Sequence, residues 1–407
     1  MDLTVSPRRR RLLFAALYLA EGAPIGFVWW ALPTLLREAG HELARITTLL
    51  ALLSLPWTLK LLGGPLVDLA RGAGWPLKRL LAGAQLAMTA TLLPLTRPGA
   101  LQDLDLLTVC LLLHAVSAAL QDVVVDALCL SVTPEHERGR VNGWMQAGML
   151  VGRGAFGGGA LLLAAQWGQT AAPAVLVGLV GAALLVVLFG VPAAAGAAPV
   201  ARPLHELARA LGAVARRRAT WRALAFALVA AGGFEAVGAV AGAYLVDRGL
   251  TSAEIALRFE LPKVVAMALG ALLGGRLCDR WGAAAATARF QVAFSGCILA
   301  LAALDSAGQG GSWIGLVALG ALYFAIGLFT SASYTLLMNL TAPRLAATQF
   351  SAFMGATNGC EMWAAFAIGR LQPSLGYAGA FGLMALVSLV AVPLVPRAGG
   401  GDRERPA

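Results

Sequence analysis

Nine ionisable residues stand inside long apolar stretches of this sequence, and each is a candidate for function because charge in an apolar segment is costly. Lys60 lies in a run of leucines, where a cation is stable only beside a carboxylate. We therefore predict that Lys60 pairs with Asp122 or Glu21. Asp122 and Asp126, four residues apart, would share one face of a helix. The nine residues are Glu21, Lys60, Asp122, Asp126, Arg153, Glu235, Glu260, Lys263 and Glu361.

These residue types could bind a solute and carry protons. Arg153 is the predicted anchor for an anionic group, because its planar guanidinium matches a carboxylate or a phosphate. The alternative is that Arg153 bridges to a carboxylate for structure alone, and that Asp122 and Asp126 only fasten their helix. His114 is expected to be a packed polar residue. The candidates for substrate binding are Arg153, Lys60, Asp122, Glu21, Gln146, Trp29, Trp30, Asn142, Tyr244 and Asn358. The candidates for proton coupling are Glu235, Glu361, Glu21 and Asp126.

The elements that must position these residues are predicted to be membrane-spanning helices. Of the 407 residues, 59% are hydrophobic and 13% are charged, whereas a soluble domain has about 25% charged residues. A helix needs about 20 apolar residues to cross a bilayer. The sequence therefore predicts an all-α integral membrane protein with twelve spans, at 12–36, 45–67, 77–96, 106–130, 141–165, 173–191, 222–246, 257–278, 288–304, 313–337, 347–369 and 377–395.

The formal net charge of +10 is explained by membrane topology and does not require a nucleic-acid partner. If the twelve runs alternate, most of the 31 Lys and Arg residues fall on the side of the N-terminus. Positive charge collects on the cytoplasmic side of membrane proteins, so both termini are predicted to be cytoplasmic, in a bacterial inner membrane. The five cysteines show no metal or redox spacing and are expected to be small packing residues.

The chain is predicted to consist of two related halves. The segment LLGGPLVD at 61–68 returns as LLGGRLCD at 272–279. Between the halves, leucines recur at three- and four-residue spacing beside arginines, which indicates an amphipathic helix on the membrane surface. The predicted parts are a six-helix bundle at 1–192, a basic linker at 193–221, a second six-helix bundle at 222–396 and a cytoplasmic tail at 397–407. Duplicated halves of this kind are typical of transporters.

Twelve helices, a central loop and a GxxxD motif after the second and eighth helices resemble the major facilitator superfamily. The resemblance implies two pseudo-symmetric bundles locked together by these motifs, with the third, sixth, ninth and twelfth helices facing lipid. Those four runs carry none of the nine ionisable residues. In the first motif Leu69 stands where the family usually has arginine, and Arg71 would substitute for it. The implied lock residues are Gly64, Asp68, Arg71, Gly275, Asp279 and Arg280.

A narrower resemblance rests on SLPWTLKLLGGPLVD at 54–68, QDVVVDA at 121–127 and PEHERG at 134–139. These segments are similar to bacterial anhydromuropeptide permeases and to their relatives, the acetyl-CoA transporters and certain siderophore permeases. The resemblance implies a permease that imports a muropeptide-, siderophore- or CoA-ester-like solute.

The expected function is proton-coupled secondary transport by alternating access, importing an amphiphilic, partly anionic solute. The expected partners are this small molecule, protons and the bilayer; no nucleic acid, no cofactor and no bound metal are expected, and the protein is expected to be a monomer. One alternative is a proton antiporter that exports a cationic or apolar compound, since carboxylates outnumber cations in the spans. Another is a membrane-embedded enzyme or a sensor that does not transport, in which Asp122 and Asp126 would imitate a metal-binding pair. Enzyme activity is not expected, and the sequence has no Walker A loop for nucleotide hydrolysis.

Overall fold

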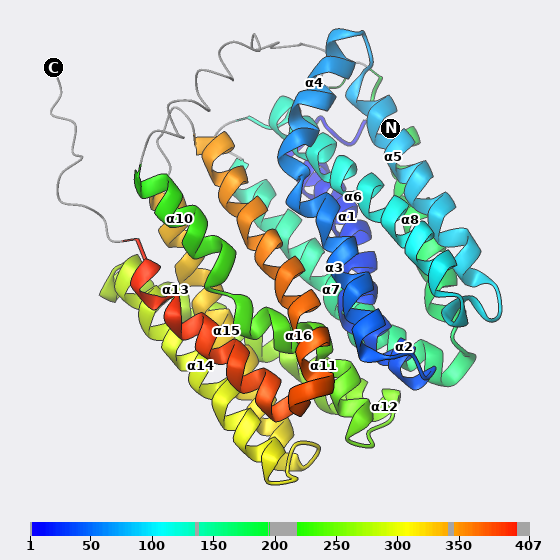
Figure 1. Cartoon of the computed structure of the whole chain (residues 1–407). Helices are drawn as coiled ribbons and strands as arrows, with labels where there is room; N and C mark the ends of the chain where they lie inside the picture. The colour runs from blue at the N-terminus through cyan, green and yellow to red at the C-terminus, as the bar shows by residue number, and fades with distance from the viewer. Residues whose placement is uncertain (1, 135–137, 194, 196–217, 341–345, 397–407) are drawn as a thin grey trace, which may run out of the picture. The chain divides into compact units, whose positions relative to one another are not determined.

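The computed structural model describes residues 2–134, 138–193, 195, 218–340 and 346–396, and these segments are built from helices (Figure 1). The predicted amphipathic linker at 193–221 lies almost entirely outside the described residues, as does the predicted tail at 397–407. Eight helical segments of the described residues are long and apolar enough to cross a membrane.

The first half of the chain forms six spans, some of them divided. The first span consists of α1, a π-helical turn and α2, while the second consists of α3, a 3₁₀ turn and α4. Two short 3₁₀ turns precede α6. The elements are α1 (Pro7–Gly26), η1 (Phe27–Ala31), α2 (Leu32–Glu38), α3 (Leu43–Thr58), η2 (Lys60–Leu62), α4 (Gly63–Gly72), α5 (Leu77–Leu92), η3 (Leu93–Thr96), η4 (Ala100–Gln102), α6 (Leu104–Val132), α7 (Arg138–Trp167) and α8 (Ala171–Gly190).

The second half supplies the other six spans. The longest helix, α16, holds two of them, because its backbone turns at Gly376, where φ is 65° and ψ is 177°. Only glycine adopts such a conformation without strain. The elements are α10 (Arg218–Val229), α11 (Gly232–Asp247), α12 (Ser252–Ile255), η6 (Ala256–Glu260), α13 (Leu261–Trp281), α14 (Ala283–Ser306), α15 (Trp313–Asn339), α16 (Ala346–Val390) and η8 (Val392–Leu394). The predicted all-α, twelve-span architecture is confirmed.

In the part of the chain that the structure describes, two π-helical turns interrupt the spans, and each is followed by proline. Pro33 lies two residues after η1, and Pro262 lies two residues after η6. A proline has no backbone N–H to donate to the preceding turn, so regular α-helical hydrogen bonding cannot continue through it. π-Helical turns inside longer helices occur frequently at functional sites.

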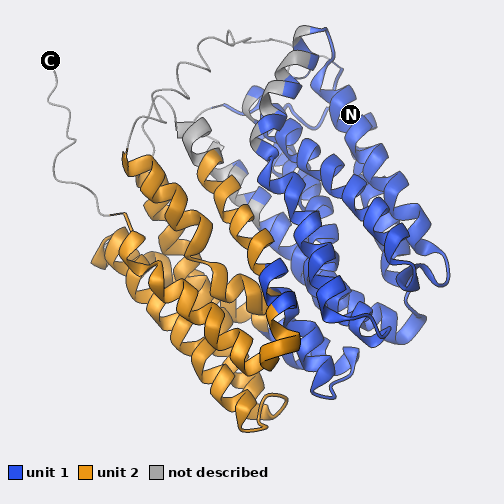
Figure 2. Ribbon diagram, viewed as in Figure 1, with its two compact units in different colours: residues 1–202, 239–262, 365–370 blue, residues 203–238, 263–364, 371–407 orange. Residues whose placement is uncertain are grey.

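Contacts divide the chain into two compact units (Figure 2). Unit 1 contains residues 1–202, 239–262 and 365–370, and unit 2 contains residues 203–238, 263–364 and 371–407. Unit 1 therefore includes the second part of α11, α12 and η6 as well as the first six spans. The predicted division into sequence-related halves, 1–192 and 222–396, concerns the internal repeat and stays a prediction.

In unit 1, α1 and α7 lie against each other through glycines. A Cβ atom on Gly22 would collide with the carbonyl oxygen of Met149, and one on Gly152 would collide with that of Leu19. Gly26 and Gly148 face backbone in the same way. Small residues of this kind allow two membrane helices to approach until their backbones touch.

Unit 2 has a core of aromatic rings and its own glycine contact. Phe234, Phe294 and Phe329 pack edge to face, with ring centroids 5.0–5.9 Å apart, an arrangement that stabilises beyond the area buried. A Cβ atom on Gly270 or Gly327 would strike the backbone of the facing helix, so α13 and α15 also approach closely.

The glycine contact in unit 1 predicts a stability effect. Gly152→Ala should force α1 and α7 apart and cost about 1–3 kcal/mol of unfolding free energy, the usual cost of overpacking. Unfolding of the purified protein by detergent titration measures this change. Gly159→Ala on the same helix is the control, because a Cβ atom there meets nothing within 4 Å. Equal stability of the two variants would contradict close backbone packing of α1 and α7.

Candidate functional site

An ion pair between Lys60 and Asp122 lies at the centre of the ionisable residues of unit 1. The Lys60 ammonium on η2 contacts Oδ2 of Asp122 on α6, which confirms the predicted pairing. Asp122 is only 5% exposed. The 3₁₀ turn of η2 brings the lysine toward α6 from the broken second span.

A tyrosine that the sequence analysis did not select completes this network. The Tyr18 hydroxyl on α1 lies 3.1 Å from Oδ1 of Asp122 and 2.6 Å from Oδ1 of Asp126. It therefore bridges the two aspartates, which share a face of α6 as predicted. Tyr18 stands three residues before Glu21 and so lies on the same side of α1. That spacing is the one signal in the sequence that could have identified it.

Glu21 is the most deeply buried carboxylate of the group. It is 1% exposed, and its oxygens make no well-formed hydrogen bond among the described residues, although the amide of Gln121 lies beside it. Lys60, Asp126 and Arg153 are close enough to act on it electrostatically. The half-buried Arg153 comes from α7, and its Nε is also buried without a hydrogen bond. The tight packing of α1 on α7 brings Glu21 and Arg153 into the same region.

Tyr18, Glu21, Lys60, Asp122, Asp126 and Arg153 are called here the charge cluster. If its carboxylates, lysine and arginine are all ionised and Tyr18 is neutral, three carboxylates face two cations, and one negative charge is left over. Charge inside membrane spans is costly unless it is compensated. One proton or one cationic group would make this cluster neutral.

Unit 2 contains the other two predicted proton carriers. Glu235 on α11 and Glu361 on α16 are half-buried, and both act electrostatically on the buried thiol of Cys360. Lys263, on α13 in the eighth span, is also buried in unit 2. Its ammonium lies 5.3 Å from the ring centroid of Tyr323. A cation over the face of an aromatic ring is stabilised by its quadrupole.

The remaining predicted substrate-binding residues are spread over both units. Trp30 packs against Gly157 in unit 1. Tyr244, also in unit 1, is fully buried, with the Arg248 guanidinium 5.3 Å from its ring centroid. Asn358 is half-buried on α16 in unit 2. The side chains of Asn142 and Gln146 lie outside the described part of the chain.

The implied lock residues are placed only in part. Arg71 is half-buried in α4, and Arg280 is exposed near the end of α13. Gly275 lies opposite the Ser331 hydroxyl. The surroundings of Gly64 and the side chains of Asp68 and Asp279 are outside the described part of the structure, so the lock stays a prediction.

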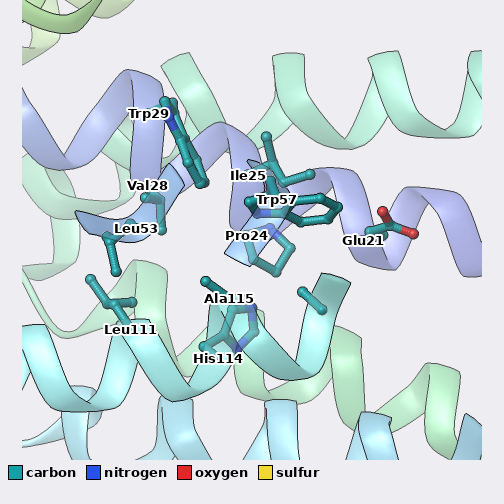
Figure 3. A pocket seen from close by; sticks show the side chains of 11 residues that line it. Glu21, Pro24, Ile25, Val28, Trp29, Leu53, Trp57, Leu111, His114 and Ala115 are labelled. Carbon is teal, nitrogen blue, oxygen red and sulfur yellow. The ribbon is translucent and has the colours of Figure 1, made fainter. Parts of the chain in front are cut away.

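A crevice inside unit 1 opens between α1, α3 and α6 (Figure 3). It begins at Glu21, passes Trp57 on α3 and reaches Trp29 in the π-helical turn. The crevice is narrow, with room for about one water molecule. His114 on α6 forms part of its wall.

Two contacts join the end of α2 to the segment 239–262 within unit 1. The Arg37 guanidinium binds both oxygens of Asp247 at 2.6 and 2.8 Å. Glu38 accepts hydrogen bonds from the backbone N–H and the hydroxyl of Ser252, at 2.8 and 2.5 Å. Bidentate arginine–carboxylate pairs are among the stronger polar contacts. These two contacts are called here the clamp.

The described residues contain no group of three or more His, Cys, Asp or Glu side chains that could hold a metal ion. Asp122 and Asp126, the pair that could imitate a metal site, instead bind Lys60 and Tyr18. The two oxygens of Asp122 are thus already in use within the protein.

Comparison with known proteins agrees with this architecture. Residues 14–369 match the Major Facilitator Superfamily. The chain belongs to this superfamily. It is therefore a multi-pass membrane transporter and not an enzyme, and its twelve helices have the major facilitator fold.

Solved structures similar to this superfamily member include a D-xylose–proton symporter, with a TM-score of 0.74, 11% identity and coverage of 95% of this chain and 96% of the other. The nucleoside transporter NupG has a TM-score of 0.72 and 12% identity, with coverage of 96% and 98%. A bacterial homologue of the human lysosomal transporter Spinster has a TM-score of 0.66 and 16% identity, with coverage of 96% and 94%. At these identities the likeness concerns the fold.

The ion pair predicts strong coupling between Lys60 and Asp122. In a double-mutant cycle, Lys60→Met and Asp122→Asn should each destabilise the protein, and the double variant should recover about 1–3 kcal/mol of the sum. Detergent unfolding measures the cycle. The control combines Asp122→Asn with Lys78→Met, since the Lys78 ammonium contacts the Leu188 carbonyl and not a carboxylate. Additive effects in both cycles would show that the ion pair contributes nothing.

Proposed function

We propose that this chain is a proton-coupled secondary transporter that imports an amphiphilic, partly anionic solute by alternating access. The observation that carries the proposal is the charge cluster within the spans of unit 1, which has one carboxylate more than it has cations. Ionisable residues placed inside membrane helices mark solute and proton pathways in transporters. The superfamily supplies the transport function, and the cluster supplies a reason for proton coupling.

In this proposal Arg153 binds the anionic group of the solute. Its Nε is buried without an acceptor among the described residues, so a carboxylate or phosphate of the solute would complete its hydrogen bonding. Lys60 is less suited to this task because Asp122 already neutralises it. The ammonium would act by holding Asp122 and Tyr18 in place. Trp29, Trp30, Tyr244, Asn142, Gln146 and Asn358 remain proposed contacts for the rest of the solute.

Glu21 is the proposed proton carrier in unit 1. Its carboxylate is buried beside the Gln121 amide without a well-formed hydrogen bond among the described residues, whereas the single proton of the Tyr18 hydroxyl is donated to Asp122 or to Asp126. A proton on Glu21 removes the surplus negative charge. An anionic solute bound at Arg153 would favour protonation of Glu21, and a proton on Glu21 would favour binding of the anion. This coupling links the movement of the solute to the movement of the proton. Glu235, Glu361 and Asp126 are the further proposed sites for protons.

The similarity of segments 54–68 and 121–127 to muropeptide, acetyl-CoA and siderophore permeases supports the direction and the solute class. We further propose a bacterial inner-membrane location, cytoplasmic termini, a monomeric state and the division into halves at 1–192 and 222–396. Positive charge near the N-terminus, including Arg8 to Arg11, supports the orientation.

The first test is uptake into proteoliposomes of a labelled anhydromuropeptide, a ferric siderophore or acetyl-CoA. An acidic exterior should drive accumulation of one of them, by about tenfold for one pH unit when one proton is coupled. A protonophore should abolish the accumulation. Efflux of a cationic compound driven by the same gradient would favour the antiporter instead. The surplus of carboxylates in the spans is the observation that supports this alternative.

Glu21→Gln should separate proton coupling from solute movement. Because glutamine stays neutral, gradient-driven accumulation should fall about tenfold, to near equilibration, while exchange of solute for solute continues. Paired measurements of accumulation and counterflow distinguish these effects. Asp105→Asn serves as the control, since Asp105 is an exposed carboxylate in the first turn of α6. Full accumulation by Glu21→Gln would exclude Glu21 as the proton carrier.

The clamp predicts a second functional effect. Alternating access requires contacts at one end of the transport path to form in one state and break in the other. Arg37→Asp and Asp247→Arg should each slow transport because the clamp cannot form, and the charge-swapped double variant should restore part of the rate. The coupling in stability should be about 0.5–1 kcal/mol, since both groups are partly exposed. Failure of the swapped pair to recover any transport would argue against a role for the Arg37–Asp247 contact.

A further inference from the structure

Tyr18 joins two carboxylates that lie inside the spans of unit 1. Its hydroxyl oxygen is 2.6 Å from Oδ1 of Asp126 and 3.1 Å from Oδ1 of Asp122. A hydrogen bond needs one proton between its two oxygens, and a tyrosine hydroxyl has only one proton to donate. If both aspartates were ionised, the hydroxyl would bond to one of them and would turn a lone pair toward the other. The two contacts together therefore require a second proton, carried by one of the two aspartates.

This second proton has two possible positions. When it is on Asp126, Asp126 donates to the Tyr18 oxygen and Tyr18 donates to Oδ1 of Asp122, whose Oδ2 contacts the Lys60 ammonium. When it is on Asp122, both hydrogen bonds point the other way. The same heavy-atom positions serve both arrangements, so the proton can change place without a movement of the helices.

The apolar surroundings of Tyr18 require that it stays neutral during such an exchange. The residue is 5% exposed and belongs to the same buried apolar cluster as Phe14, Val125 and Met145. A phenolate in this position would be a buried charge without a cation in contact, which is costly. The hydroxyl must therefore receive one proton as it gives up the other.

Other ionisable groups act on the hydroxyl from a greater distance. Glu21, on the next turn of α1, and the thiol of Cys129 on α6 influence it electrostatically. Lys60 reaches it through Asp122, and Arg153 on α7 acts on Glu21. Among the described residues, the hydrogen bonds of the hydroxyl go to the two aspartates. A proton that crosses Tyr18 therefore passes between Asp122 and Asp126.

We propose that Tyr18 is a proton relay between Asp126 and Asp122. The proton of Asp126 moves to the Tyr18 oxygen while the hydroxyl proton of Tyr18 moves to Oδ1 of Asp122. One proton is thereby transferred from Asp126 to Asp122, the tyrosine is unchanged, and the reverse step returns the proton. Asp126 is half-buried, whereas Asp122 is only 5% exposed, so the relay connects the more accessible carboxylate to the interior of the charge cluster. The inference rests on the proposed proton coupling and gives that coupling a route.

The competing role for Tyr18 is that of a structural contact between α1 and α6. Such a contact does not need a proton on either aspartate, and its loss would impair every mode of transport alike. A relay instead affects the steps in which protons move. Exchange of solute for solute involves no net movement of protons and would continue without the relay.

Infrared difference spectroscopy of the purified protein in nanodiscs tests for the second proton without any solute. Acidification should produce the carbonyl band of a protonated carboxyl group that is lost in Asp126→Asn. Tyr18→Phe should shift this band to higher frequency, because the acid loses its hydrogen-bond acceptor. Tyr377→Phe, which removes a hydroxyl from a buried ring of α16, is the control and should leave the band in place. An unshifted band in Tyr18→Phe, or the absence of a band that depends on Asp126 while the protein is folded, would overturn the inference.

Transport measurements test the relay itself. They use whichever of the labelled anhydromuropeptide, the ferric siderophore and acetyl-CoA the wild type accumulates. Tyr18→Phe should lower the initial rate of gradient-driven uptake by about a hundredfold, the lower end of the effect of a positioned proton-transfer group. Counterflow should continue, and Tyr377→Phe should behave as the wild type in both assays. An equal loss of uptake and counterflow would assign Tyr18 to structure alone, and an unchanged rate of uptake would also refute the relay.

Asp126→Asn keeps the inference testable if Tyr18→Phe does not fold. Asparagine still forms a hydrogen bond with the Tyr18 hydroxyl, but its amide cannot carry the transferred proton. Gradient-driven uptake should slow as it does in Tyr18→Phe, and counterflow should continue. Uptake at the wild-type rate would show that no proton passes through Asp126 and would overturn the inference.

Because the infrared measurement needs no transport, the two proposals fail separately. A band shift in Tyr18→Phe without accumulation of any probe by the wild type would refute proton-coupled import and leave the shared proton standing. Proton-driven uptake at an unchanged rate in Tyr18→Phe would refute the relay alone.

Discussion

The cost of holding charge inside membrane-spanning helices governs the arrangement of this transporter. Lys60, Asp122 and Tyr18 come from three different elements and satisfy one another within unit 1. Each would be destabilising alone, because hydrocarbon offers no polar partner. Their mutual dependence determines how the broken second span, α1 and α6 must pack. Glu21 and Arg153, which are less completely satisfied among the described residues, lie beside this network and are the proposed proton and solute sites.

The helix interruptions serve the same arrangement. The 3₁₀ turn at Lys60–Leu62 presents the lysine to α6, and the π-helical turn at Phe27–Ala31 places Trp29 beside the crevice. Prolines close to the interruptions explain why regular helix does not continue there. The local departures from ideal geometry therefore coincide with the side chains that carry the proposed chemistry, whereas regular helix supplies most of the remaining packing.

Much of the fold could be predicted from sequence, because apolar runs long enough to cross a bilayer leave few alternatives to helix. The Lys60–Asp122 pair was predictable for a similar reason, since a buried cation needs a carboxylate. Tyr18 was not, because a hydroxyl in an apolar helix acquires its role only from tertiary packing. Arg37 and Asp247 lie 210 positions apart, and no local sequence pattern predicts their contact. His114 was expected to be a packed polar residue, and it is buried with its Nδ1 3.1 Å from the carbonyl oxygen of Met88.

The glycines between α1 and α7 have a consequence for motion. Where main chains touch, no flexible side chain remains to absorb sliding or tilting. The two helices should therefore move as one rigid body during a transport cycle. Glu21 lies on α1 and Arg153 lies on α7, so the distance between their backbones would stay constant while the other helices rearrange. Changes in protonation or solute binding at these residues would then follow from changes in water access, and not from a change in the distance between the two helices.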